Sequence, residues 1–265
     1  EDCPMILCID IGNTNIKLGL YRDGKQITHW RIFTDAKKLA DEYAVLMLSL
    51  FATESVHREE IHGCAISSVV PELTIAFRDM VRRQLHLEPL IVSAAAGRVM
   101  KVNAANPSEV GADLIANAVG AVALYGAPVI VIGFGTATTF SAVSASGQFE
   151  GVAIAPGILT GTESLISHGA MLPQVDLHRP EQAIGKTTIQ SLQAGIIYGF
   201  AGLVEGLVAR IQQELGGNAK VVATGGLERI IARDVHCIDA YEPELTLEGV
   251  RIIYETVMQD QPGAV

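Results

Sequence analysis

The first forty residues alternate short apolar runs with small polar turns. We predict strands at residues 5–9, 16–21 and 25–33. The first run is continuous, which is typical of a strand buried on both faces, and Asp23-Gly24 supplies a tight turn into the third strand. This pattern predicts a hairpin system at the start of the chain.

The same pattern occurs a second time, over residues 129–151. Residues 9–15 align with residues 132–138, and both copies run from a buried strand through a small-residue turn into a second and a third strand. The second copy is not a dinucleotide-binding fingerprint, because Thr138 stands where that motif needs its third glycine and the turn leads into a strand. The repeat therefore argues against a Rossmann dehydrogenase.

Apolar residues at helical spacing predict helices in the remaining segments. The expected helices cover residues 36–51, 72–87, 113–125, 187–215 and 245–258, with one more entered from the turn at 153–162 and another after Thr224-Gly225-Gly226. Short strands are expected at residues 63–70, 90–93 and 220–223. In the longest helix four glycines recur at roughly helical spacing, which permits close packing against the sheet or a second subunit.

The order of elements predicts two α/β domains with mixed β-sheets flanked by helices. A chain of 265 residues, 49% of them apolar, is long enough for two domains, which we expect at residues 1–112 and 113–265. The closing helix at about 245–258 is expected to pack back on the first domain. If the two copies face each other, their polar turns form opposite walls of an active-site cleft between the domains.

Net charge and cysteine content indicate in which compartment the protein works and which classes of partner it binds. The net charge of −10 and the pI near 5.1 disfavour nucleic acid and anionic membrane surfaces. The four cysteines are scattered without a C-x-x-C spacing, which indicates reduced, mostly buried thiols. We expect no stretch that is long and apolar enough to span a bilayer, and no secretory signal. A cytoplasmic protein without nucleic-acid or membrane partners is predicted.

Both polar turns offer groups that can bind phosphate. Asp10 follows the first strand and could hold a divalent metal, while backbone N–H groups and a hydroxyl of the turn could cradle phosphate oxygens. A plain β-hairpin with a polar turn explains this stretch equally well, and the second copy shifts the balance toward phosphate. The candidates are Gly12, Asn13 and Thr14 in the first turn and Gly135, Thr136 and Thr138 in the second.

Two further positions are candidates for the active site. Asp113 follows Gly111-Ala112 at the start of a small-residue helix, where the helix N-terminus favours an ionised carboxylate. A helix-capping role explains Asp113 equally well. Gly225-Gly226 forms either a simple turn or a surface on which a flat base approaches the backbone. The seven histidines show no metal-ligand spacing.

Taken together, these residues resemble the acetate and sugar kinase, actin and heat-shock-chaperone superfamily and, within it, the type III pantothenate kinases. The matching segments are IDIGNT (9–14), SSVVP (67–71), NPSEVGAD (106–113), ANAVG (116–120), FGTATTF (134–140), Pro156-Gly157 and GKTTIQSLQAGIIYG (185–199). The resemblance implies two ribonuclease-H-like domains in a homodimer. It also implies transfer of the ATP γ-phosphoryl group to the primary hydroxyl of pantothenate, the first step toward coenzyme A.

The resemblance assigns roles to individual residues. Asp10 would hold Mg²⁺ and the phosphates, Asp113 would take the hydroxyl proton of pantothenate, and Thr188 would reach pantothenate from the partner subunit. The implied ATP contacts are Gly12, Asn13, Thr14, Asn15, Lys17, Gly135, Thr136, Thr138, Gly225 and Gly226. The implied pantothenate contacts also include Gly111 and Ala112.

Several positions depart from the family pattern. Leu114 stands where the family usually has an arginine that is expected to help bind the pantothenate carboxylate. Gly133 replaces an aspartate associated with the activating monovalent cation, K⁺ or NH₄⁺, and Ser141 occupies another position that is often aspartate. Gly169 and Met171 replace a usual threonine and lysine. Two alternatives follow: a catalytically weakened relative that binds a nucleotide or has a regulatory role, or a kinase for another small hydroxylated substrate.

Overall fold

The computed structural model describes residues 4–93, 99–169, 171–226, 231 and 233–259 and divides the chain into two compact units. Unit 1 comprises Glu1–Ala123 and Leu245–Val265, and unit 2 comprises Leu124–Glu244. The first boundary between the units lies near the end of helix α3 (Ala112–Tyr125), whereas the sequence analysis expects domains at residues 1–112 and 113–265. The reason is that α3 packs against the closing helix α7 (Leu245–Gln259), which belongs to unit 1.

Unit 1 is built on a five-stranded sheet with the order β3-β2-β1-β4-β5. Its strands are β1 (Met5–Ile11), β2 (Asn15–Arg22), β3 (Lys25–Phe33), β4 (Ile61–Ser68) and β5 (Leu90–Ile91). The strands β1, β2 and β3 are antiparallel, while β4 runs parallel to β1 and β5 parallel to β4. The predicted hairpin system is confirmed, but β1 extends to Ile11, so Asp10 lies inside the strand.

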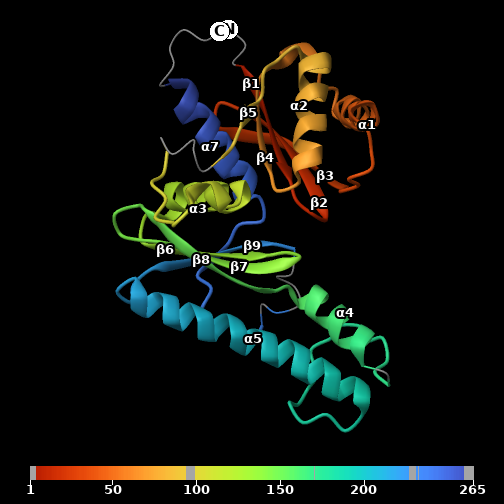
Figure 1. Ribbon diagram of the computed structural model, residues 1–265, viewed down its shortest axis with the longest axis vertical. Helices are drawn as coiled ribbons and strands as arrows, with labels where there is room; N and C mark the ends of the chain where they lie inside the picture. Colours follow the sequence, from red (N-terminus) through yellow and green to blue (C-terminus); the bar gives the residue numbers. More distant parts are fainter. Residues whose placement is uncertain (1–3, 94–98, 170, 227–230, 232, 260–265) are drawn as a thin grey trace. The chain divides into compact units, whose positions relative to one another are not determined.

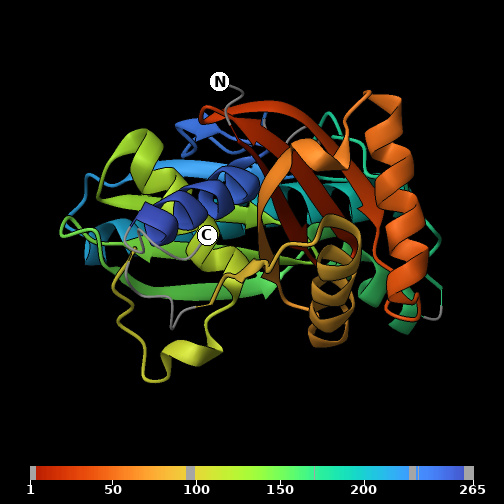
Figure 2. The ribbon, with the colours of Figure 1, turned by 90° about the horizontal axis from the view of Figure 1, so that it is seen from above.

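Helices cover both faces of this sheet (Figures 1 and 2). Helices α1 (Ala40–Thr53) and α2 (Pro71–Leu85) pack side by side on one face, and α7 lies on the other. The core under α1 and α2 includes Leu7, Ile9, Ile11, Tyr43, Phe51 and Phe77. Because side chains alternate along a strand, Cys8 and Asp10 point to the α7 face of the sheet.

Helix α7 approaches the sheet closely. A Cβ on Gly63 of β4 would lie 2.1 Å from the hydroxyl oxygen of Tyr254, so only glycine leaves room for that ring. Arg251 packs over the ring of Tyr21 on β2, 5.8 Å from its centroid. These contacts fix the end of the chain on the sheet formed by its beginning.

Unit 2 repeats the strand order of unit 1. Read from the corresponding edge, its sheet has the order β8-β7-β6-β9-β10, with β6 in the central position that β1 has in unit 1. Its strands are β6 (Val129–Phe134), β7 (Ala137–Val143), β8 (Phe149–Pro156), β9 (Lys220–Gly225) and β10 (Ala240–Tyr241). The internal repeat thus corresponds to a repeated sheet. The second turn is one residue shorter than the first: the Gly135 N–H donates to the carbonyl oxygen of Ala137, whereas the Gly12 N–H donates to that of Asn15, each at 3.0 Å.

Helices α4 (Ile158–His168) and α5 (Thr188–Glu214) belong to unit 2. An 18-residue window of α5 has a mean hydropathy of 1.5, so by length and composition alone this helix could cross a membrane, and the expectation that no stretch is long and apolar enough is wrong. Its isoleucine, leucine and valine residues raise the hydropathy, and its buried residues pack against the sheet as in a core helix. The helix predicted after Gly226 falls largely outside the described residues.

The described cysteines are free thiols. Cys8 and Cys64 are buried and Cys237 is half-buried, whereas Cys3 lies outside the described residues. Burial raises the pKa of the Cys8 and Cys64 thiols, so both stay protonated. Reduced, mostly buried thiols were predicted, and these three agree.

Candidate active site

The first polar turn, between β1 and β2, is held by a residue that follows β3. Thr34 donates its hydroxyl to the carbonyl oxygen of Gly12 at 2.7 Å and its N–H to that of Thr14 at 3.0 Å. Asn13, Thr14 and Asn15 are exposed. Thr34 therefore holds the backbone of the turn in place while the turn exposes its polar groups, an arrangement suited to binding phosphate.

Asp10 lies one residue before the end of β1, on the face of the sheet that α7 covers. Its carboxylate accepts a hydrogen bond from the Ser67 hydroxyl at 3.1 Å, and Ser67 is its neighbour on the parallel strand β4. Lys17 is its neighbour on β2. Asp10 therefore places a half-buried carboxylate beside the exposed polar residues of the first turn.

This arrangement fits a magnesium ion that shares its coordination with phosphates. Mg²⁺ is usually held by one or two carboxylates together with waters and substrate phosphate oxygens, and not by a complete protein cage. Asp10 supplies one such carboxylate. Within the described residues, no three His, Cys, Asp or Glu side chains gather to form a different metal site.

The second polar turn, between β6 and β7, is supported by the start of α4. The carbonyl oxygen of Thr136 accepts hydrogen bonds from the Gly157 N–H at 3.1 Å and from the Thr160 hydroxyl at 2.8 Å. A Cβ on Gly157 would lie 2.2 Å from the carbonyl oxygen of Gly135, so only glycine fits there. The N-terminus of α4 thus lies beside this turn, where its dipole favours an anion.

The hydroxyl groups of the second turn are not equivalent. Thr136 is exposed, whereas Thr138 is fully buried with its hydroxyl directed at the carbonyl oxygen of Pro156, 3.4 Å away. The Thr138 side chain therefore faces the interior of unit 2. Gly135 and Thr136 are the members of this turn that a phosphate can reach.

The glycine pair at the end of β9 lies beside the same turn. Gly225 has φ +108°, and a Cβ there would lie 2.1 Å from the carbonyl oxygen of Phe134, the residue before Gly135. The Gly226 N–H donates to that carbonyl at 3.3 Å. The ends of the parallel strands β6 and β9 therefore combine a phosphate-type turn with a flat backbone surface, the usual location of ligands in such sheets.

Gly225→Ala is expected to destabilise the protein, while the adjacent Gly226→Ala serves as its matched control. The first change adds a clash and a strained φ, which we expect to cost about 1–3 kcal/mol of unfolding free energy. The second meets no atom within 4 Å, so its effect should stay within about 0.5 kcal/mol. Denaturant unfolding of both variants measures the difference. Equal stabilities would contradict this account of Gly225.

Asp113 is the second residue of α3. A Cβ on Gly111 would lie 2.5 Å from its Oδ1 atom, so the carboxyl group folds back over the helix start. Burial raises the pKa of Asp113, and hydrogen bonds from the N–H groups of Leu114 and of Asp113 itself oppose that shift only in part. A half-buried carboxylate with a raised pKa at a helix N-terminus is suited to accept a proton. Ala112, beside it, is buried.

Each unit brings together part of the predicted set. Unit 1 gathers Asp10, Lys17 and the first turn at one strand end, and its helix α3 carries Asp113. Unit 2 gathers the second turn and the glycine pair. Thr188 begins α5 with an exposed side chain, next to Thr187, whose hydroxyl accepts a hydrogen bond from the Gln190 N–H.

Sequence reasoning missed the residues that hold these groups in place. Ser67 lies in a segment that was matched to a family, but its bond to Asp10 depends on the pairing of β1 with β4. Thr34 and Thr160 belong to no motif, and each reaches its turn across more than twenty residues of sequence. No local signal indicates such contacts.

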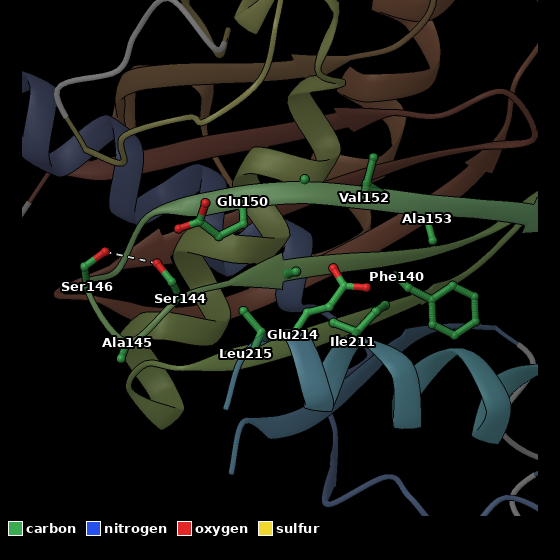
Figure 3. A pocket seen from close by; sticks show the side chains of 12 residues that line it. Phe140, Ser144, Ala145, Ser146, Glu150, Val152, Ala153, Ile211, Glu214 and Leu215 are labelled. Atoms are coloured by element: carbon green, nitrogen blue, oxygen red, sulfur yellow. Dashed lines mark hydrogen bonds between the residues drawn. The ribbon is translucent and has the colours of Figure 1, made fainter. Parts of the chain in front are cut away.

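Unit 2 also contains a pocket of about 900 Å³ between β7, β8 and the end of α5 (Figure 3). Glu150 and Glu214 lie on its walls, over an apolar surface that includes Phe140 and Ile211. None of the predicted ATP or pantothenate contacts lines it. The pocket is therefore separate from the candidate site.

Comparison with known proteins places the chain in a family. The model of the type III pantothenate kinases matches residues 6–210. The chain belongs to this family. A type III pantothenate kinase from Roseiflexus sp. (strain RS-1) is 52% identical over 251 residues, covering 95% of this chain and 98% of that protein. Another from Moorella thermoacetica is 48% identical, covering 95% and 99%.

Solved structures agree on the fold. The activator of 2-hydroxyisocaproyl-CoA dehydratase from Clostridium difficile superposes with a TM-score of 0.60 at 16% identity, over 99% of this chain and 98% of that one. A putative 2-dehydro-3-deoxygalactonokinase from Sinorhizobium meliloti gives 0.55 at 12% identity, over 98% of each chain. The predicted fold class, two ribonuclease-H-like α/β domains with mixed sheets flanked by helices, is confirmed.

The positions at which the sequence analysis expects departures from the family pattern have distinct environments. Leu114 is buried in α3 and Ser141 is buried in β7, whereas Met171 is 92% exposed. A Cβ on Gly133 would lie 2.6 Å from the hydroxyl of Thr139. Gly133 offers no side-chain oxygen, so the residues present do not fit the monovalent-cation site that an aspartate would provide there.

Proposed function

We propose that this protein transfers the γ-phosphoryl group of ATP to the primary hydroxyl of pantothenate, giving 4′-phosphopantothenate, the first step toward coenzyme A. The observation that carries the proposal is the near-full-length likeness to proteins named type III pantothenate kinase, at about half of all aligned positions. The two phosphate-type turns and the half-buried Asp113 carboxylate support it.

The proposed chemistry assigns one task to each group. Asp10 binds Mg²⁺, and the turns at Gly12–Thr14 and Gly135–Thr136 contribute backbone and hydroxyl groups that bind phosphate oxygens, while the N–H groups of Gly12 and Gly135 hold the turns themselves. When bound, Mg²⁺ neutralises charge on the phosphates. The acceptor oxygen forms a bond to the γ-phosphorus, the bond from that phosphorus to the ADP oxygen breaks, and the Asp113 carboxylate takes the hydroxyl proton. Positioning and charge stabilisation contribute most of the rate in such transfers.

Leu114 favours a second candidate function, a kinase for a small hydroxylated acceptor without a carboxylate. A buried leucine cannot donate a hydrogen bond to an anion. Losing one charged hydrogen bond costs about 1.5–3 kcal/mol of binding, roughly tenfold or more in affinity. Under the main proposal, the KM for pantothenate is therefore expected to be high for this family. Under the second candidate function, the acceptor has no carboxylate, so Leu114 causes no loss of binding.

A homodimer in the cytoplasm completes the proposal. Exposed apolar side chains gather on α4 and near the start of α5, where Thr188 lies: Leu159, Leu165, Met171, Ile184 and Ile189. At Gly195, Gly199 and Gly202 of α5 an added Cβ would meet nothing within 4 Å, so these positions leave room for a second helix. A second copy covering this surface would bring Thr188 to the partner's pantothenate. Sedimentation of the purified protein tests the dimer.

The deciding experiment measures ADP release with ATP and Mg²⁺ and three acceptor conditions: pantothenate, pantothenyl alcohol, or none. Pantothenyl alcohol carries a hydroxymethyl group in place of the carboxylate and is the matched control for Leu114. Turnover that depends on pantothenate and exceeds turnover with the alcohol supports the proposal. The reverse order favours an acceptor without a carboxylate. ATP binding without turnover indicates a catalytically weakened, nucleotide-binding relative.

Repeating the assay with and without K⁺ or NH₄⁺ tests the monovalent-cation requirement, which Gly133 is expected to weaken.

A further inference from the structure

The helix that carries Asp113 is held by the last helix of the chain through close backbone contact. A Cβ on Gly249 of α7 would lie 1.8 Å from the carbonyl oxygen of Ala116 on α3, and one on Gly120 of α3 would lie 2.9 Å from that of Leu245. At this crossing the two backbones therefore approach closely, and the Leu245 side chain lies 3.1 Å from where a Cβ on Gly120 would be. Packing of apolar side chains alone leaves a scatter of about 15–20° in how two helices cross, which a specific polar contact can narrow.

One buried hydrogen bond crosses the same contact. The Thr246 hydroxyl at the start of α7 donates to Oδ1 of Asn117 on α3 at 2.8 Å, and each side chain is only 6% exposed. Rotating or sliding α3 would separate this donor from its acceptor away from water, which is costly. The hydrogen bond thus favours the observed orientation of α3 on α7.

The position of Asn117 connects this hydrogen bond to the candidate active site. Asn117 follows Asp113 by four residues, about one helical turn, so the two side chains lie on the same side of α3. A rotation of α3 at Asn117 therefore turns the Asp113 carboxylate by the same angle. The backbone N–H groups that bond to that carboxylate move with it.

We propose that Thr246 and Asn117 are positioning residues, whose hydrogen bond sets the orientation of α3 and thereby the placement of the Asp113 carboxylate. The inference deepens the proposed function and rests on it for the role of Asp113 as proton acceptor. Thr246 lies 129 residues from Asn117 in sequence. The C-terminal helix then serves the transfer step as well as the core of unit 1.

Thr246→Val, which removes the hydroxyl and keeps the branched shape, tests the proposal beside Thr246→Ser, which keeps the hydroxyl. We expect the valine variant to lower kcat roughly 10- to 100-fold, because small displacements of a reacting group have effects of this size. The KM for ATP should not change, and the serine variant should restore kcat. Thr256→Val is the matched control, since the Thr256 hydroxyl donates to Ile252 within α7.

A purely structural role predicts a different result. If Thr246→Val lowers the melting temperature but keeps the wild-type kcat, or if Thr256→Val loses as much kcat, the proposal is overturned. Should Thr246→Val not fold, Thr246→Ala replaces it, because the smaller side chain leaves space beside Asn117.

Hydrogen–deuterium exchange over residues 111–117 gives a readout that needs no acceptor. Faster exchange in Thr246→Val than in Thr246→Ser supports the proposal, and equal exchange contradicts it. If the wild-type protein shows no pantothenate-dependent turnover, the proposed function fails, and the exchange comparison still decides whether this hydrogen bond orders the start of α3.

Discussion

Asp113→Asn is expected to lower kcat for pantothenate-dependent ADP release by roughly 10²–10⁴-fold, the range over which a positioned general base contributes. The carboxamide keeps the shape of the side chain but cannot take the hydroxyl proton. The KM for ATP should stay near the wild-type value, because the phosphate turns are untouched. Steady-state kinetics with each substrate varied in turn separates the two effects.

The same variant should not be less stable at neutral pH. Because burial raises the pKa of Asp113, the folded state binds its proton more tightly than the unfolded state does. The free energy of unfolding therefore falls as the pH rises from the unfolded pKa through the folded one, and above it the charged side chain is a net cost. The acid limb of kcat/KM should accordingly lie above about pH 3.9, where an ordinary aspartate titrates.

Asp41→Asn is the matched control for Asp113→Asn. Asp41 is also the second residue of its helix, α1, but its side chain is 81% exposed and pairs with Arg83. Loss of a helix-terminal charge alone should leave turnover unchanged, since such a charge contributes only about 0.3–1 kcal/mol to stability. Unchanged turnover in Asp113→Asn would remove Asp113 from the role of base. A similar loss in both variants would point to helix stability instead.

Asp10→Asn is expected to lower kcat/KM for ATP by about 10²–10³-fold, as removal of a single group that stabilises transition-state charge does. An amide oxygen is a neutral and weaker ligand for Mg²⁺ than a carboxylate oxygen. The hydrogen bond from Ser67 can still form to that oxygen, so the end of β1 should keep its structure. Titration of turnover with Mg²⁺ measures the change, and the half-saturating concentration should rise.

Asp23→Asn is the control for Asp10→Asn on the same hairpin. Asp23 lies in the turn between β2 and β3 with φ 53°, a conformation that asparagine also adopts readily. Its replacement should alter neither turnover nor the Mg²⁺ requirement. If Asp10→Asn behaves like this control, Asp10 does not hold the metal, and the assignment of the first turn to phosphate loses its main support.

The sequence by itself determined the strands, the helices and the family. A continuous apolar run such as 129–134 predicts a buried strand, and apolar residues at helical spacing predict an amphipathic helix. Both can be predicted because the spacing of apolar residues is a property of the local sequence. The repeat of residues 9–15 at 132–138 predicted two similar sheets. Local pattern also marked Asp113, since a carboxylate at a helix start has a recognisable position.

Only the tertiary structure decided how these groups are held. Whether a hydroxyl faces a ligand or the core depends on which strands pair. The sequence predicts Thr138 as a phosphate contact, but its side chain is buried and its hydroxyl is directed at Pro156. The bond from Ser67 to Asp10 and the bond from Thr246 to Asn117 join residues 57 and 129 positions apart. Contacts of that separation leave no periodic signal, because packing of whole elements creates them.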